Sequence, residues 1–130
     1  MKLRLLLVVA CLALPGAALA APTATILTGT FQKRISKKAP PLNGAWKLKL
    51  KQDGTFELSR NGVIVVRGVA AGVSGRLAIG DRTGPYRCTG AQRAAVYTYT
   101  LRGQTLTLRP VIEPCAGRRS VLTTGTFKKQ

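Results

Sequence analysis

Residues 44–66 read GAWKLKLKQDGTFELSRNGVIVV. Apolar residues alternate with polar or cationic residues twice in this segment, first over 46–51 and again over 56–59. Gln52-Asp53-Gly54 separates the two runs, and Asn61-Gly62 follows the second. Asn-Gly suits a two-residue hairpin turn because both of its positions adopt positive φ. The segment therefore predicts consecutive antiparallel strands, each of which buries one face.

The same alternation recurs along the rest of the chain. Further strands are predicted at about 25–31, 63–66, 77–79, 96–101, 106–108 and 121–127. Arg67-Gly68 is expected to end its strand, 80–84 is expected to form a turn, and one helical turn is expected near 115–120. Short strands with tight connections predict an all-β fold, an antiparallel up-and-down meander closed into an eight- or nine-stranded barrel, since closure removes exposed edges. A sandwich is the alternative topology.

The first twenty residues have the pattern of a secretory signal peptide. A basic head at Met1–Arg4 precedes an apolar run at Leu5–Leu14, and Ala18-Leu19-Ala20 supplies small residues for cleavage. We expect cleavage after Ala20, which leaves one domain at 21–130 in a secreted or periplasmic location. In the alternative reading, Val8–Cys11 is a lipobox and Cys11 carries a lipid anchor. No transmembrane segment is expected in the mature chain.

The charge balance bears on the kind of function. The chain has 21 Lys+Arg, 4 Asp+Glu and no His, for a formal net charge of +17. Cleavage would remove Lys2 and Arg4, which leaves 19 basic and 4 acidic residues and a net charge of +15. Without histidine and with few carboxylates, the usual general bases, acid–base pairs and metal ligands are missing. We therefore expect no enzyme, no catalytic residue, no metal and no cofactor.

Two cysteines, Cys88 and Cys115, follow the expected cleavage site. An even number of cysteines in an exported domain predicts a disulfide. Nucleic acid is not an expected partner, because the aromatic residues share the apolar faces of the strands rather than the cationic ones.

Several motifs together resemble those of a known family. In chain order they are Gly44-x-Trp46, Asp53-Gly54, Gly68, Leu77-x-Ile79, Gly84-x-x-x-Cys88, Tyr97-x-Tyr99-x-Leu101, Leu106-x-Leu108 and Glu113-x-Cys115-x-x-Arg118. This pattern resembles small exported bacterial lipocalin-like proteins of the calycin type, with Glu113 and Tyr99 in place of the family's Asp and Trp. The resemblance implies a barrel with a binding role. It also implies that Trp46 closes one end of the barrel against an arginine, Arg118 or Arg119.

The inward-facing set provides the first hypothesis about function. Its members are Trp46, Leu48, Leu50, Phe56, Leu58, Tyr97, Tyr99, Leu101, Leu106 and Leu108. These residues either line a cavity for an apolar or amphipathic small molecule, with the tyrosine hydroxyls orienting it, or fill a solid core. The first reading predicts an exported binding protein that carries or sequesters such a molecule.

The basic residues provide the alternatives. The candidate anion-binding surface is Lys33, Arg34, Lys37, Lys38, Lys47, Lys49 and Lys51. A solid basic barrel with this surface would dock on anionic envelope lipids or polymers, although the same charges also serve plain solubility. A calycin-type protease inhibitor, acting through a terminal segment at Ala21–Thr25, is the remaining alternative.

Overall fold

The computed structural model describes residues 16, 25–36 and 40–130. Apart from Gly16, the predicted signal peptide with Cys11 lies outside the described residues, as do residues 21–24 of the terminal segment and Lys37 and Lys38. In chain order the elements are β1 (Gly29–Ile35), η1 (Pro40–Leu42), β2 (Gly44–Leu50), β3 (Thr55–Arg60), β4 (Val63–Val73), β5 (Arg76–Thr83), η2 (Gly90–Gln92), β6 (Ala94–Arg102), β7 (Thr105–Ile112), α1 (Ala116–Thr123) and β8 (Phe127–Lys129). Here η denotes a single 3₁₀ turn.

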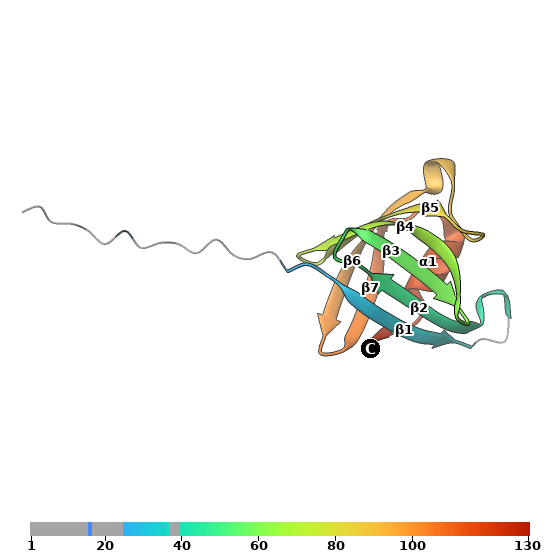
Figure 1. The fold of residues 1–130 in the computed structure, drawn as a ribbon, viewed down its shortest axis with the longest axis horizontal. Coiled ribbons are helices and arrows are strands. Elements are labelled where there is room, and N and C mark those ends of the chain that lie inside the picture. The colour runs from blue at the N-terminus through green and yellow to red at the C-terminus, as the bar shows by residue number, and fades with distance from the viewer. Residues whose placement is uncertain (1–15, 17–24, 37–39) are drawn as a thin grey trace, which may run out of the picture.

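Each strand pairs antiparallel with the next one in the sequence, and β8 pairs with β1 (Figure 1). The eight strands therefore form a closed up-and-down barrel, as the alternation predicted. Asn61 and Gly62 have φ values of 50° and 82°, which confirms the turn expected between β3 and β4. Asp53 stabilises the turn between β2 and β3, because its Oδ1 accepts a hydrogen bond of 2.9 Å from the Thr55 N–H.

Strands β4 and β5 are longer than the sequence indicated. The predicted end at Arg67-Gly68 is wrong, since β4 continues to Val73, and the predicted turn at 80–84 belongs largely to β5. The glycines here allow close approach between strands rather than turns. A Cβ atom at Gly68 would overlap the carbonyl oxygen of Gly80 on the neighbouring strand β5, which precedes Asp81, the register partner of Gly68.

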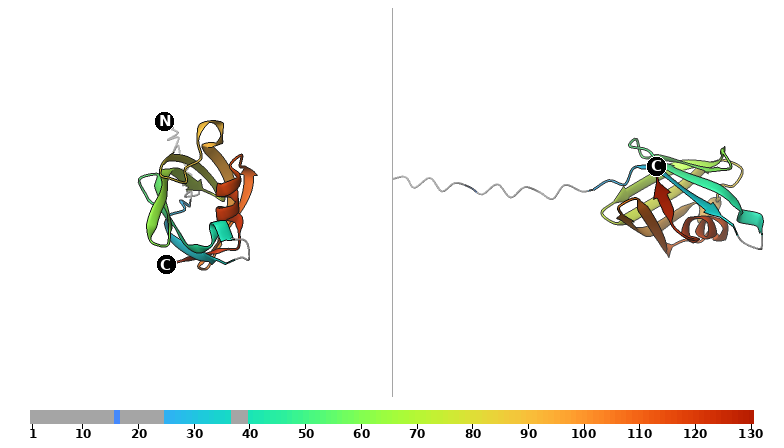
Figure 2. Two further views of the ribbon diagram at one scale, coloured as in Figure 1. Left: turned by 90° about the vertical axis from the view of Figure 1, so that its right-hand side faces the viewer. Right: turned by 90° about the horizontal axis from the view of Figure 1, so that it is seen from below.

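The predicted strand at 121–127 is also wrong. Residues 116–123 form α1, and only Phe127–Lys129 form a strand. Val121 and Leu122 are typical strand residues, but with Arg118 they form a buried face at helical spacing. Because β8 pairs only with Thr105 and Leu106 of β7, α1 takes a place in the barrel wall beside the rest of β7 (Figure 2).

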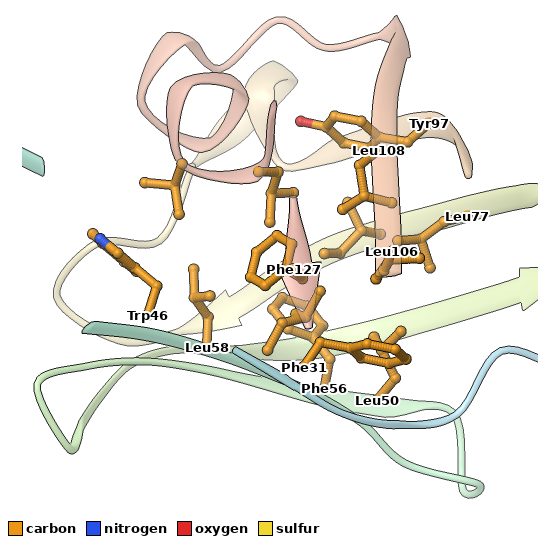
Figure 3. Packing of buried hydrophobic residues seen from close by; sticks show 14 of the residues in the cluster. Phe31, Trp46, Leu50, Phe56, Leu58, Leu77, Tyr97, Leu106, Leu108 and Phe127 are labelled. Atoms are coloured by element: carbon orange, nitrogen blue, oxygen red, sulfur yellow. The ribbon is translucent and has the colours of Figure 1, made fainter. Parts of the chain in front are cut away.

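The barrel has two ends with different contents. The end that holds the β6–β7 hairpin is tightly filled, and we call it the packed end; its residues are Phe31, Leu50, Leu77, Leu106 and Phe127, none more than 4% exposed. Figure 3 shows Phe31, Phe56 and Phe127 together, with Trp46 lying apart from them beyond Leu58. The opposite end, where η1 and α1 lie, is called the cavity end.

Candidate binding cavity

The predicted inward-facing residues take three kinds of position. Eight of the ten are buried: Trp46, Leu48, Leu50, Phe56, Leu58, Tyr97, Leu106 and Leu108. Tyr99 is half-buried and packs against the buried cluster. Leu101 is 38% exposed, because it lies at the end of β6 beside the hairpin, where no strand covers it.

A cavity of about 320 Å³ lies at the cavity end. Its apolar wall comes from six strand residues and two helix residues: Trp46, Leu48, Phe56, Leu58, Val66, Ile79, Val121 and Leu122. Pro41, Tyr86 and Gly117 also line it and are exposed, so they mark its opening. The charged residues of the wall are Asp81 and Arg118. The arrangement is a largely apolar pocket with few polar groups, which is typical of small-molecule sites.

Trp46 is held in place at the wall of this cavity. Its Nε1–H donates a 2.8 Å hydrogen bond to the carbonyl oxygen of Leu42 in η1. The guanidinium of Arg60 lies 5.4 Å from the centre of the indole ring. The arginine that covers Trp46 is therefore Arg60. The expectation that Arg118 or Arg119 has this role is wrong, because Arg118 faces two carboxylates and Arg119 is exposed.

Asp81, Glu113 and Arg118 form a buried group that we call the ionic cluster. Arg118 Nε and Nη2 donate to the two carboxylate oxygens of Glu113 at 2.7 and 2.9 Å. Nη1 and Nη2 also donate to the carbonyl oxygens of Arg93 and Gln92, at 2.6 and 2.8 Å. Nη1 lies 3.1 Å from Asp81 Oδ1. The two carboxylates thus hold Arg118 fixed against the barrel wall.

Glu113 is the centre of hydrogen bonding in the ionic cluster. Besides Arg118, it accepts hydrogen bonds from the Tyr97 hydroxyl and from the Cys115 N–H. Burial alone would raise the pKa of Glu113, but the hydrogen bonds from Arg118, Tyr97 and Cys115 bring it below its ordinary value. Burial, followed by the contact with Glu113, raises the pKa of Tyr97. The Tyr97 hydroxyl therefore serves Glu113, whereas the sequence suggested that it orients a ligand.

The predicted disulfide joins Cys88 to Cys115, with an S–S distance of 2.01 Å. It connects the segment after β5 to the start of α1. The Cys88 N–H donates a 2.7 Å hydrogen bond to Asp81 Oδ2, and the Cys115 N–H donates one of 2.8 Å to Glu113. The disulfide therefore fixes the backbone donors that hold both carboxylates of the ionic cluster.

Lys33 does not lie on the outer surface where the sequence placed it. It follows Phe31 and precedes Ile35 at two-residue spacing, so it points inward with them. Its Nζ donates a 2.8 Å hydrogen bond to the Thr124 carbonyl at the end of α1 and lies 4.0 Å from the centre of the Phe127 ring. Burial lowers the pKa of Lys33 to about 7. Lys33 thus links β1 to α1 and β8.

The other described members of the candidate anion-binding surface lie on the outside of the barrel. Arg34, Lys47 and Lys49 are exposed. Lys51 is partly buried and forms a 2.7 Å ion pair with Glu57, which also stands opposite Lys49 across β2 and β3. A strip of free cations is therefore present, but one acidic residue neutralises part of it.

The sequence analysis missed Asp81 as a site residue. It was assigned to a turn, but it is the inward-facing residue that follows Leu77 and Ile79 at two-residue spacing in β5 and is only 1% exposed. The alternation Leu77-x-Ile79-x-Asp81 contained this signal. The glycines on either side of the segment hid it, because Gly80 and Gly84 are also typical of turns.

Comparison of the chain with models of protein families, with curated proteins and with solved structures finds no match. Within the residues that the structure describes, no helix has the length and apolar character required to span a bilayer.

Proposed function

We propose that this protein is an exported, lipocalin-like binding protein that holds an apolar or amphipathic small molecule in the cavity at one end of its barrel. It acts by binding rather than by catalysis. The observation that carries the proposal is the apolar pocket of about 320 Å³ at one end of the barrel. That volume is at the lower limit of the range found for ligand sites.

The size of the cavity limits the size of the ligand. A water molecule occupies about 30 Å³ in the liquid, so the cavity corresponds to about ten non-hydrogen atoms. A short alkyl chain with one head group, or a single substituted ring, meets this limit. A long-chain lipid would have to extend past Tyr86 into solvent.

Two features support the lipocalin-like assignment and the exported location. Gly44-x-Trp46 follows a 3₁₀ turn at the start of a barrel strand, and Arg60 covers the tryptophan at that end of the barrel. The disulfide between Cys88 and Cys115 is of the kind that persists in oxidising compartments.

The exposed cations on β1 and β2 support a second candidate, docking on an anionic envelope surface. Arg34, Lys47 and Lys49 lie on the outside of the barrel, and the chain carries a net charge of +17. Attraction of this kind weakens steeply as salt screens it. Binding to anionic vesicles that survives high salt would contradict this second candidate.

The cavity hypothesis is tested by filling the cavity. Trp46 is the chain's single tryptophan and lines the cavity, so its emission reports occupancy. We expect 1-octanol to bind the disulfide-bonded protein with 1:1 stoichiometry and with little dependence on salt, because burial of apolar surface is not screened. Val121→Phe places a ring in the cavity and should weaken binding by roughly tenfold or more.

The matched control is Val63→Phe, because Val63 is 64% exposed on the outside of the barrel. It should bind 1-octanol like the unsubstituted protein. Absence of binding, or equal binding by the Val121→Phe and Val63→Phe variants, would contradict the proposed function.

A further inference from the structure

One atom in the wall of the cavity lacks a hydrogen bond. Among the residues that the structure describes, Asp81 Oδ1 is the buried side-chain polar atom without a hydrogen-bond partner. Asp81 lines the cavity and is 1% exposed. Its other oxygen, Oδ2, accepts from the Cys88 N–H. Arg118 Nη1 lies 3.1 Å from Oδ1 and attracts it, but its N–H is not aligned for a hydrogen bond.

Arg118, the other charged residue of the wall, has one N–H that donates no hydrogen bond, and its nitrogen, Nη1, is already ion-paired with Asp81. A guanidinium has five N–H groups. Four of them donate to Glu113, Arg93 and Gln92, and the Nη1 that carries the fifth is paired with Asp81. An anionic head group in the cavity would therefore find its positive partner already occupied. It would also lie beside a carboxylate oxygen.

The formal charges of the ionic cluster also disfavour an anionic head group in the cavity. Asp81 and Glu113 carry two negative charges against one positive charge on Arg118, so the cluster is formally −1 inside a chain of net charge +17. A buried carboxylate oxygen without a donor is costly, and a ligand that donates to it removes that cost. A ligand that brings a third carboxylate increases it.

We propose that the cavity selects amphiphiles whose polar group donates a hydrogen bond, an alcohol or a primary amine, and that Asp81 Oδ1 accepts that bond. This inference rests on the proposed binding function and defines its ligand class. The alkyl part lies against Trp46, Leu58 and Ile79, and the head group lies toward β5 and α1. Carboxylate amphiphiles such as fatty acids are excluded, although the overall charge of the protein attracts them.

The test compares probes that differ in the head group alone. We titrate the disulfide-bonded protein with 1-octanol, its isomer 1-methoxyheptane, octylamine and octanoate, and follow Trp46 emission at pH 7.5 and about 150 mM NaCl. Charges on the outer surface are largely screened beyond about 8 Å in this buffer, whereas the buried Asp81 is not. 1-Octanol and 1-methoxyheptane have the same atoms and no charge, so their difference isolates hydrogen-bond donation.

We expect octylamine and 1-octanol to bind roughly tenfold more tightly than octanoate. The affinity for 1-octanol should exceed that for 1-methoxyheptane by about fivefold. Binding of octanoate equal to or tighter than 1-octanol would overturn the inference and leave the proposed function in place. Equal affinity for all four probes would also overturn the inference and leave the proposed function in place. If none of the four probes binds, both proposals fall.

A substitution at the acceptor provides the second measurement. In Asp81→Asn, the amide oxygen is expected to keep the Cys88 N–H, so the amide NH₂ replaces Oδ1 and presents a donor. We expect the preference for octylamine over octanoate to fall by roughly tenfold. Asp53→Asn, at an exposed turn, is the matched control and should keep the preference. An unchanged preference in a folded Asp81→Asn protein would overturn the inference, and the comparison of probes decides it alone if that variant does not fold.

Discussion

The packed end and the cavity end of the barrel are built from strands with the same alternation, yet they differ in what fills them. At the packed end, Phe31 from β1 and Phe127 from the neighbouring strand β8 lie close together inside the barrel with leucines around them. At the cavity end, α1 replaces a strand in the wall and presents Val121, Leu122 and Arg118. A solid core and a lined cavity are thus realised in the same small barrel, one at each end.

The two ends also differ in the contacts that stabilise them. Apolar packing holds the packed end together, whereas the cavity end relies on the ionic cluster and the disulfide. Because the ionic cluster and the disulfide hold the wall of the cavity end in place, its interior can stay open without side chains that fill it. The predictions below separate these two modes of stabilisation.

The largest effect is expected from Arg118→Met. The substitution keeps a long side chain but leaves Asp81 and Glu113 buried without their positive partner, which should lower the free energy of unfolding by about 3–5 kcal/mol. Urea unfolding of the disulfide-bonded protein measures it. Arg119→Met, at the exposed neighbouring position, should change the free energy by less than about 0.5 kcal/mol. A loss below about 1 kcal/mol for Arg118→Met would mean that packing holds both ends alike.

A pair of identical substitutions compares the two ends directly. Leu106 belongs to the packed end and is fully buried, whereas Leu58 lines the cavity. Leu106→Ala should cost about 3–4 kcal/mol, since it removes contacts on every side and leaves a void. Leu58→Ala should cost about 1 kcal/mol less, because one side of Leu58 already faces open space. Equal losses of unfolding free energy would contradict a hollow cavity end.

The smallest effect concerns Lys33, which lies where the two ends meet. Burial lowers its pKa to about 7 in the folded protein, from 10.5 for an unperturbed lysine. Between these values the unfolded chain binds more protons, so stability should rise as the pH increases from about 7 toward 10. A tenfold change in proton affinity is worth about 1.4 kcal/mol, and since solvent reaches part of this side chain we expect a rise of ~1–2 kcal/mol.

Lys33→Met should remove this rise, because no group then titrates at that position. Thermal unfolding at a series of pH values compares the two proteins. Parallel pH profiles for the substituted and unsubstituted proteins would show that Lys33 is as accessible to water in the folded state as in the unfolded one.

Local features of the fold were predictable from the sequence, whereas features that depend on contacts between distant elements were not. Alternation and the Asn61-Gly62 turn are local signals, and they predicted the meander, its closure and most of the buried residues. The disulfide followed from counting cysteines. The sequence misassigned three charged residues, Lys33, Asp81 and Arg118. Charged residues are usually exposed, so an inward-facing one is not expected unless its partners are known. Those partners belong to other elements of the fold, and they come close to the charged residues only once the barrel has closed.

The helical turn expected near 115–120 is confirmed, but the helix extends to Thr123, and the strand predicted from Val121 is wrong for a related reason. Val121-Leu122 favours a strand locally, and an eighth long strand would have closed the barrel with regular pairing. The preference for a helix arises from Arg118, whose pairing with Glu113 places it and the two apolar residues on one side. Hydrophobic periodicity could not predict the ion pair between Arg118 and Glu113.

The short strand that closes the barrel also determines the order in which the chain can fold. Gln130 Nε2 donates to Gln32 Oε1 across a separation of 98 residues, and β8 contributes only Phe127–Lys129 to the seam. Each hairpin from β2 to β7 forms from neighbours in the sequence, but the seam forms only when Phe127–Lys129 return to β1. Until then β1 and β7 both present unpaired edges that can pair with another chain. Residues 127–129, although outside the cavity, therefore cover two strand edges that would otherwise be open to pairing with another chain.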